Sequence, residues 1–591
     1  ATLSFYLVSA SPEVEKYAIL SNYQLDGVLR YGEHKFRLNK TFFCSDEFFK
    51  MFSYPLIYGN PETALSEPFS IVLSKSLAKK FFGDNDPLGE VLQLSNRVQL
   101  KVTGITGDLP ENTQLKFKAL ISMETMFRLY GENLRTTWWA DVMHTYVKLS
   151  KGTKPDEFEK KLNDFVQGRF AKELTERNED MVFHLQAIKS IHLNSNYPQE
   201  IEVNGNGKSV SFLLIISILI LIIAWVNYIN LSTARSMERA RDVGLRKVSG
   251  ATRPQLIRQF LIESLFVNLL AVIIALIIVE ISYPYFSQLT GLTVTLNLWT
   301  NPVFWLLFTL VILAGSLLSG LYPAFVLSSF KPITVLKSKS VKNTRGAVLR
   351  KGLILFQFVI SLLLIAGTLT INRQIAYMQD RNLGIDLEQT LVVKAPGSID
   401  STWNLRQKTF KAELLSNPSI EKMCASYFVP GDEVWYTNGY IKKHNNDANT
   451  SRTLNVIHVD ADFIPFYNLE FIAGRNFIEG NQNDVLCHII NREALELLGF
   501  NSPEEAIDQE LETPNWDMTH KIIGVIENYH QESLRENYAP TIYTNLPHPR
   551  WAKQYSVKIH SKNIQETIAF VEKNFMESFP GNILEYFVLD S

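Results

Sequence analysis

The stretch FLLIISILILIIAWV, residues 212–226, lies inside a longer run that carries no charged side chain. About 20 such apolar residues, wound as a helix, cross a hydrocarbon core of about 30 Å. Soluble proteins bury single helices of this kind, but four uncharged runs so close together are typical of a membrane protein. The sequence therefore predicts four membrane-spanning helices, centred on the uncharged runs 209–234, 264–279, 302–330 and 352–372.

The composition of the 591 residues excludes several classes of protein. Lys and Arg number 58 against 60 Asp and Glu, and this balance argues against a nucleic-acid partner, because phosphate binding needs a basic excess. Apolar residues make up 46%, too many for a disordered chain, and the length calls for several domains. The three cysteines, Cys44, Cys424 and Cys487, are too few for a disulfide framework. We expect free, buried thiols; a Cys424–Cys487 bond within one segment is the alternative.

The loops between the runs differ in charge. Residues 235–258 carry seven Lys or Arg against Glu238 and Asp242, residues 328–351 carry seven with no acid, and residues 280–301 carry none. Short loops rich in Lys and Arg stay in the cytoplasm. We therefore place both basic loops inside, and both long polar segments, 1–208 and 375–591, on the outer side.

The two long polar segments repeat each other. Short motifs occur in the same order and at similar spacing in both, which indicates an internal duplication. In the first segment, FSIVLSKSLAKKFFG (69–83) predicts a strand, a serine-started helix and a closing glycine, and LQLSNRVQLKVTGI (92–105) predicts a hairpin. The corresponding stretches are 46–60 with 461–475, 71–83 with 488–500, 86–92 with 504–511, and 101–110 with 521–530. Asp508 in the second copy stands where the first has Gly89, and Asp tolerates an unusual backbone dihedral better than most residues.

A short amphipathic helix is predicted over residues 234–248, in the first basic loop. Met237, Ala240 and Val243 recur every third residue, and arginines cover much of the remaining surface. One interpretation is a basic helix resting on anionic lipid. The other is a docking helix for a cytoplasmic partner, which the acids Glu238 and Asp242 among the arginines favour.

The end of this helix and the start of the next span carry their own signals. Gly250 can end the helix in the left-handed conformation. Thr252 and Gln255 have the spacing of a capping box, and Pro254 suits a first helical turn.

No motif for catalysis or metal binding stands out. The chain has no G-x-x-x-x-G-K-[ST] phosphate loop, no H-E-x-x-H or C-x-x-C pair, and its 11 histidines are scattered. Inside the spans, Gly315, Ser316, Ser319 and Gly320 predict close helix packing.

Two stretches carry a family resemblance. NYINLSTARSMERARDVGLRKVSGAT (227–252), followed by QFLIESL (259–265), and LSGLYPAFVLSSFKPITVLK (318–337) resemble the FtsX/MacB permease family of ABC transporters. Both outer segments resemble its periplasmic MacB-type core domain. The resemblance implies a non-catalytic permease subunit that binds no cofactor itself and works with a separate cytoplasmic ABC ATPase, in two copies, that uses ATP and Mg. It also implies that the basic-loop helix couples to this ATPase through Met237, Glu238, Arg239, Arg241, Asp242, Val243, Gly244, Arg246, Lys247 and Gly250.

The expected fold class is an α+β membrane protein, with an α-helical transmembrane bundle and two duplicated mixed α/β extracytoplasmic domains. Double-repeat members of this family have eight spans, so we expect a chain without its first and last transmembrane helices in the bacterial inner membrane. The expected organisation is a first periplasmic domain (1–208), spans at 209–234, 256–280, 302–328 and 352–372, a coupling helix (235–253), an outer loop (281–301), a cytoplasmic linker (329–351) and a second periplasmic domain (375–591).

These features favour two functions and disfavour a third. The first is the permease of an exporter or mechanotransmission complex, with membrane lipid and a periplasmic adaptor or substrate protein as further partners. The alternative is an FtsX-like regulator that activates a periplasmic hydrolase or signalling partner without transport. An outer-face enzyme anchored by helices is disfavoured, because no catalytic motif is present.

Overall fold

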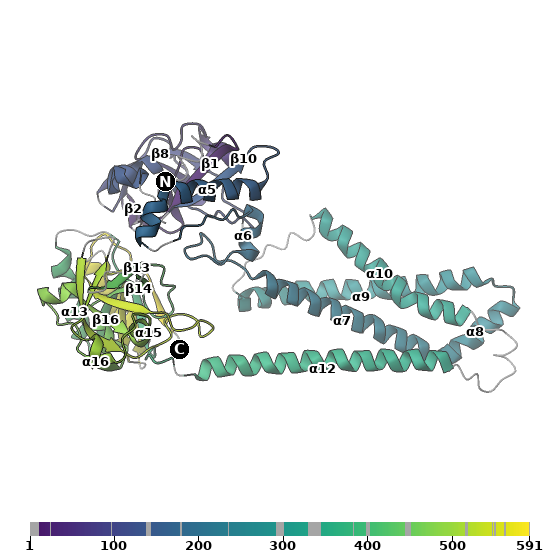
Figure 1. Ribbon diagram of the computed structural model, residues 1–591. Coiled ribbons are helices and arrows are strands. Elements are labelled where there is room, and N and C mark those ends of the chain that lie inside the picture. Colours follow the sequence, from purple (N-terminus) through teal and green to yellow (C-terminus); the bar gives the residue numbers. More distant parts are fainter. Residues whose placement is uncertain are drawn as a thin grey trace. The chain divides into compact units, whose positions relative to one another are not determined.

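The computed structural model contains two α/β lobes and a set of long helices (Figure 1). Contacts within the chain separate the helical unit, Gly205–Met378, from the unit that holds both lobes, Ala1–Asn204 with Gln379–Ser591. The structure describes residues 11–23, 25, 27–95, 97–110, 112–136, 143–177, 180–234, 236–290, 301–328, 344–381, 383–397, 402–443, 451–513, 518–546, 548, 551–560 and 563–589.

The first lobe is a mixed sheet with helices packed on it. Alternate residues of its strands enter different cores: Ile71 and Leu73 pack on one face, and Val72 on the other. Both faces are therefore covered at the centre of the sheet, where the strands Thr41–Cys44, Ser70–Ser74 and Ala119–Ser122 are buried at every residue. The order across the sheet is β10-β1-β4-β9-β6-β8-β7-β2-β3, with β5 also paired to β8. The elements are β1 Val14–Ser21, β2 Val28–Tyr31, β3 His34–Arg37, β4 Thr41–Cys44, α2 Phe48–Met51, β5 Leu56–Gly59, β6 Ser70–Ser74, α3 Lys75–Phe82, β7 Val91–Leu94, β8 Val98–Thr106, β9 Ala119–Ser122, α4 Met123–Tyr130, η1 Glu132–Arg135, β10 His144–Leu149, α5 Pro155–Arg177 and α6 Ile188–Asn194.

The local predictions for this lobe are confirmed. Ser74 ends β6 and caps α3, where its hydroxyl accepts the Leu77 backbone N–H at 3.4 Å. Gly83 ends the helix with a φ of 62°. The predicted hairpin is the antiparallel pair β7–β8.

The second lobe has a larger sheet of the same kind. Its order is β13-β17-β18-β16-β19-β14-β12-β20-β11-β21, with β15 also paired to β18. All three cysteines of the chain are free and buried, as expected; Cys424 and Cys487 share one core cluster here without a bond between them. The elements are β11 Thr390–Lys394, α13 Trp403–Leu415, β12 Ile420–Ser426, β13 Thr437–Lys442, β14 Arg452–Val459, α14 Phe463–Phe466, β15 Phe471–Gly474, η4 Gln482–Leu486, β16 Cys487–Asn491, α15 Arg492–Leu497, α16 Pro503–Ala506, β17 Glu510–Thr513, β18 Met518–Ile526, β19 Thr541–Asn545, β20 Gln554–Ile559, α17 Ile564–Ser578 and β21 Tyr586–Leu589.

The two lobes share several strand pairings. β4–β9 and β14–β19 are parallel, β5–β8 and β15–β18 antiparallel, and β6–β8 and β16–β18 parallel. The last two pairs even share a register shift, between Ile71 and Val72 and between His488 and Ile489, which are aligned positions. A shared irregularity of this kind indicates one ancestral fold, since bulges persist within families.

The aligned pair Gly89 and Asp508 behaves as expected. Both have a positive φ, 83° and 66°. Both backbone N–H groups also donate to the same strand position, Val102 O at 2.8 Å and Ile522 O at 2.9 Å.

The helical unit contains the four predicted spans. Four of its described helices are long and apolar enough to cross a membrane, and their large side chains, such as Phe266 and Leu362, stay mostly exposed on the protein surface. Apolar surface of this extent is stable when lipid covers it. The helices are α7 Gly207–Ala234, α8 Ser236–Val248, α9 Arg253–Thr290, α10 Pro302–Ser328 and α12 Thr344–Asp380.

Two helices are longer than the spans expected from hydropathy. α9 continues past residue 280, with Pro284 inside it, to Thr290, and α12 begins at Thr344 and ends at Asp380. An uncharged run marks the part of a helix that lies in hydrocarbon, not the point where its backbone hydrogen bonds stop. Parts of the predicted outer loop and cytoplasmic linker, residues 291–300 and 329–343, lie outside the described residues.

Candidate functional site

The candidate site is built on α8, the short helix between α7 and α9 (Figure 1). Its boundaries follow the sequence signals. Gly250 follows the helix with a φ of 97°, and Gln255 Oε1 accepts the Thr252 backbone N–H at 2.9 Å, which is one half of a capping box. These two caps make a tight turn that brings α8 back against the start of α9.

One face of α8 packs on α9. Val243 and Leu256 are buried against each other, with Phe260 and Ala251 around them. Two polar contacts flank this apolar centre: Arg239 Nη2 lies 2.7 Å from Glu263 Oε1, and Arg246 Nη1 donates to Gln259 Oε1 at 2.6 Å.

The partners of α8 on α9 occupy one helical face. Leu256, Gln259 and Glu263 are spaced by three and four residues, so they point the same way. Gln259 and Glu263 were not predicted as partners of this helix; their signal in the sequence is a polar pair at this spacing near the inner end of an apolar span.

α8 also contacts the end of α10. Lys247 Nζ donates to the backbone oxygen of Ser328 at 2.6 Å. Ser328 is the last residue of α10, where carbonyl groups lack helical partners and a cation is stabilised by the helix dipole. A single short helix is therefore bonded to two membrane helices.

α9 and α10 are themselves joined inside the membrane. Ser264 Oγ lies 3.0 Å from Ser319 Oγ and donates to Ser316 O at 3.2 Å, and Asn268 Nδ2 donates to Ser264 O at 2.8 Å. A Cβ added at Gly320 would lie 2.9 Å from Ser264 Cβ. The predicted small-residue packing is confirmed.

Gly315 brings a third helix into this packing. A Cβ added there would lie 2.5 Å from Trp225 Nε1 on α7. The absence of a side chain at this position lets α7 and α10 approach closely.

The opposite face of α8 is open. Arg241 and Asp242 are exposed and have no partner among the described residues. Leu245 and Val248 are 53% and 67% exposed. Apolar side chains beside two opposite charges are typical of a protein contact surface.

The predicted site residues thus fall into separate groups. Arg239, Val243, Arg246 and Lys247 face the protein itself, Gly244 is buried and Gly250 ends the helix. Arg241 and Asp242 face outward. The side chains of Met237 and Glu238 lie outside the described part of the chain. Leu245 and Val248, which the prediction did not include, complete the open face.

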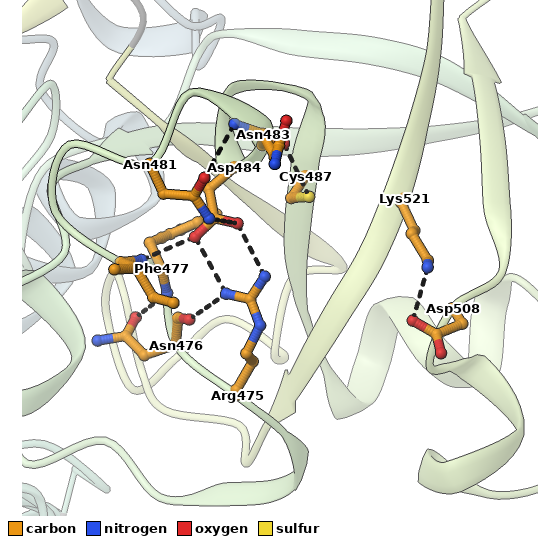
Figure 2. Close-up of polar contacts among 10 residues, drawn as sticks. Arg475, Asn476, Phe477, Asn481, Asn483, Asp484, Cys487, Asp508 and Lys521 are labelled. Carbon is orange, nitrogen blue, oxygen red and sulfur yellow. Dashed lines mark hydrogen bonds and ion pairs between the residues drawn. The ribbon is translucent and has the colours of Figure 1, made fainter.

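A second polar site lies in the second lobe, at a hollow of about 610 Å³ (Figure 2). The Arg475 guanidinium donates two hydrogen bonds, of 2.8 and 3.0 Å, to the fully buried Asp484 carboxylate. The carboxylate also accepts the Ile478 backbone N–H at 2.7 Å and Asn481 Nδ2 at 3.0 Å. The Arg475 hydrogen bond lowers the pKa of Asp484 despite its burial, so this loop is closed by a charged pair.

The far wall of the hollow carries a pair that the first lobe lacks. Lys521 Nζ lies 3.0 Å from Asp508 Oδ1, apart from the Arg475–Asp484 pair (Figure 2). The aligned residues of the first lobe are Lys101 and Gly89, so that lobe has no carboxylate at the position of Asp508. The two lobes share a fold but differ in surface chemistry here.

The fold and the site together define a multi-pass membrane protein whose inner connecting helix is bonded to its spans. Two segments of the chain match known protein families. Residues 2–165 match the MacB-like periplasmic core domain, and residues 214–332 match the FtsX-like permease C-terminal domain. Over these two segments the chain is similar to permeases of the FtsX/MacB type, and together with its apolar helices this indicates a multi-pass protein of the bacterial inner membrane with a periplasmic segment.

Curated relatives are of the same kind. The macrolide export ATP-binding/permease protein MacB of Bdellovibrio bacteriovorus is 24% identical over 205 residues, covering 33% of this chain and 28% of that protein. The ABC transporter permease YknZ of Bacillus subtilis is 25% identical over 276 residues, covering 45% of this chain and 61% of that protein. The chain thus matches less than two thirds of the length of either relative.

Solved structures of outer domains also match. The periplasmic region of MacB from Actinobacillus actinomycetemcomitans is 12% identical with a TM-score of 0.25, covering 36% of this chain and 93% of that structure. The extracellular domain of YknZ from Gram-positive bacteria is 13% identical with a TM-score of 0.24, covering 34% of this chain and 100% of that structure.

Proposed function

We propose that the chain is the transmembrane subunit of an ABC-type exporter or mechanotransmission complex. A separate cytoplasmic ATPase, in two copies, binds and hydrolyses ATP with Mg. Its movement is received by α8 and passed through the spans to the periplasmic lobes. Four spans separate the two lobes in the chain, and an even number places both lobes on the same side of the membrane.

The double attachment of α8 carries this proposal. Arg239 bonds to α9 and Lys247 bonds to the end of α10, so a force on α8 acts on both helices. The Ser264–Ser319 contact then joins these helices deeper in the membrane. The hairpin of α9 and α10 is therefore expected to move as one rigid unit, because bending one helix alone would break buried hydrogen bonds.

The open face of α8 supplies the contact for the ATPase. Leu245 and Val248 offer apolar area, and Arg241 and Asp242 add charges that fix the orientation of a partner. The resemblance of residues 227–252 to the FtsX/MacB family implies a coupling helix here, which agrees with this assignment.

The lobes, rather than the spans, would handle the substrate. The hydrophobic windows of the spans hold few charged residues, whereas an aqueous route across a membrane needs a polar lining. A substrate already in the periplasm would therefore be expelled or handed on by movement of the lobes.

The test is binding and stimulation of the partner ATPase by the full chain in lipid nanodiscs. Leu245→Asp and Arg241→Glu should each weaken ATPase binding at least tenfold, because they alter an exposed contact face. Lys79→Glu, an exposed lysine on α3 with no partner among the described residues, makes the same charge change in a periplasmic lobe and should have no effect. Unchanged binding and ATPase rate with both α8 variants would contradict the proposal.

A further inference from the structure

A groove of about 530 Å³ lies at the inner ends of α9 and α10, away from α8. Two arginines, Arg253 and Arg258, stand at its mouth, and no acid lines it among the described residues. Its walls are apolar and come mostly from one stripe of α9, with one aromatic side chain from α10. Its apolar lining includes Ile257, Ile262, Leu265 and Phe325.

The groove lies on a different face of α9 from the contacts with α8. Arg258, Ile262 and Leu265 are spaced by four and three residues and share one helical face. Leu256 and Glu263 share another, which α8 covers. The groove is therefore left open when α8 is in place.

The distribution of polarity along the groove matches the shape of a lipid. From Arg253 to Leu265 the helix rises by about 18 Å, with its charges at the end that meets the cytoplasmic surface and apolar side chains further into the membrane. Ile262, Leu265 and Phe325 are each more than a third exposed, so the apolar walls have no protein cover among the described residues.

The charges at the mouth select the headgroup. Arg258 has no hydrogen-bond or ion-pair partner among the described residues, and Arg253 makes only one long contact, 3.4 Å to Ser328 Oγ. Guanidinium groups bind phosphate strongly. A zwitterionic headgroup would bring its own cation to this doubly basic mouth, whereas an anionic one would not.

We propose that this groove is a binding site for one anionic phospholipid of the inner leaflet. The arginines hold its headgroup phosphate, and an acyl chain lies along Ile262, Leu265 and Phe325. A bound lipid would fill the open side of the α9–α10 pair where it leaves the membrane. The inference is independent of any ATPase.

The experiment is native mass spectrometry of the full chain in neutral detergent, titrated with phosphatidylglycerol and phosphatidylcholine of identical acyl chains. The first phosphatidylglycerol should bind about tenfold more tightly than phosphatidylcholine. Arg258→Gln should reduce this preference about fivefold. Arg241→Gln, an exposed arginine on α8, is the matched control and should leave it unchanged.

A second variant tests the apolar part. Leu265→Trp should weaken both lipids alike, because it narrows the acyl path and leaves the arginines in place. Equal affinity of the wild type for the two lipids, or equal losses from Arg241→Gln and Arg258→Gln, would overturn the proposal. The proposal would also be overturned if inorganic phosphate displaced the lipid while Leu265→Trp left lipid binding unchanged. A protein dimer in the wild type that Arg258→Gln dissociates would overturn it as well.

Discussion

Replacing Arg239 by glutamate puts a second carboxylate beside Glu263, where an ion pair of 2.7 Å now joins α8 to α9. The two side chains are 34% and 40% exposed, so losing the pair costs about 0.5–1 kcal/mol. Repulsion between like charges adds a similar amount, and the total is about 1–2 kcal/mol. We expect α8 to open from α9 about five- to thirtyfold more often.

Hydrogen exchange of the α8 amides in the full chain measures this opening directly. Arg239→Glu and Glu263→Arg should each speed exchange by the stated factor. The double exchange Arg239→Glu with Glu263→Arg restores opposite charges and should return exchange to within about twofold of the wild type. Arg241→Glu, on the open face of the same helix, is the control and should leave exchange unchanged.

The reasoning is refuted if the double variant exchanges as fast as the single variants. It is refuted equally if Arg241→Glu accelerates exchange as much as Arg239→Glu does. Either result would mean that net charge on α8, rather than the specific pair, holds it to the membrane helices.

Three further predictions concern packing and charge elsewhere. Gly320→Ala should cost about 1–3 kcal/mol, because its Cβ would lie 2.9 Å from the Cβ of a serine on α9. Gly367→Ala on α12, where a Cβ would meet nothing within 4 Å, should not lower the melting temperature, because alanine favours the helix over glycine. In the second lobe, Arg475→Ala should lower the free energy of unfolding by about 3 kcal/mol, because it leaves a buried carboxylate without its charged partner. Asp484→Asn should lower it less, because the partly exposed guanidinium can be solvated. A denaturant titration that gave the reverse order would contradict this prediction. Burial, and then the neighbouring Asp462 carboxylate, raises the pKa of Asp460 to about 7, above its usual value near 4, so the folded state holds this proton more tightly than the unfolded chain. The stability that this group contributes therefore falls as pH rises from about 4 to 7. The melting temperature of the Asp460→Asn variant should rise relative to that of the wild type between pH 5 and 8. A difference in melting temperature that stays constant over this range would refute the prediction.

Much of the architecture could be predicted because it depends on local patterns. The four spans follow from uncharged runs alone, since hydrocarbon excludes charge at every position along a helix. The likeness of the two lobes was visible in short motifs and extends to the register shift at His488. The turn at Gly250 and Thr252 also followed from residue type, because each cap is a contact within four residues of the chain.

The contacts of α8 depended on tertiary structure. Its arginines look alike in the sequence, yet Arg239 and Arg246 bond to α9 while Arg241 is open. Lys247 bonds to a backbone oxygen 81 residues away, and every residue type carries such an oxygen, so no sequence pattern marks it. Helical periodicity states which side chains share a face; only the packed position of a second helix decides which of those faces is covered.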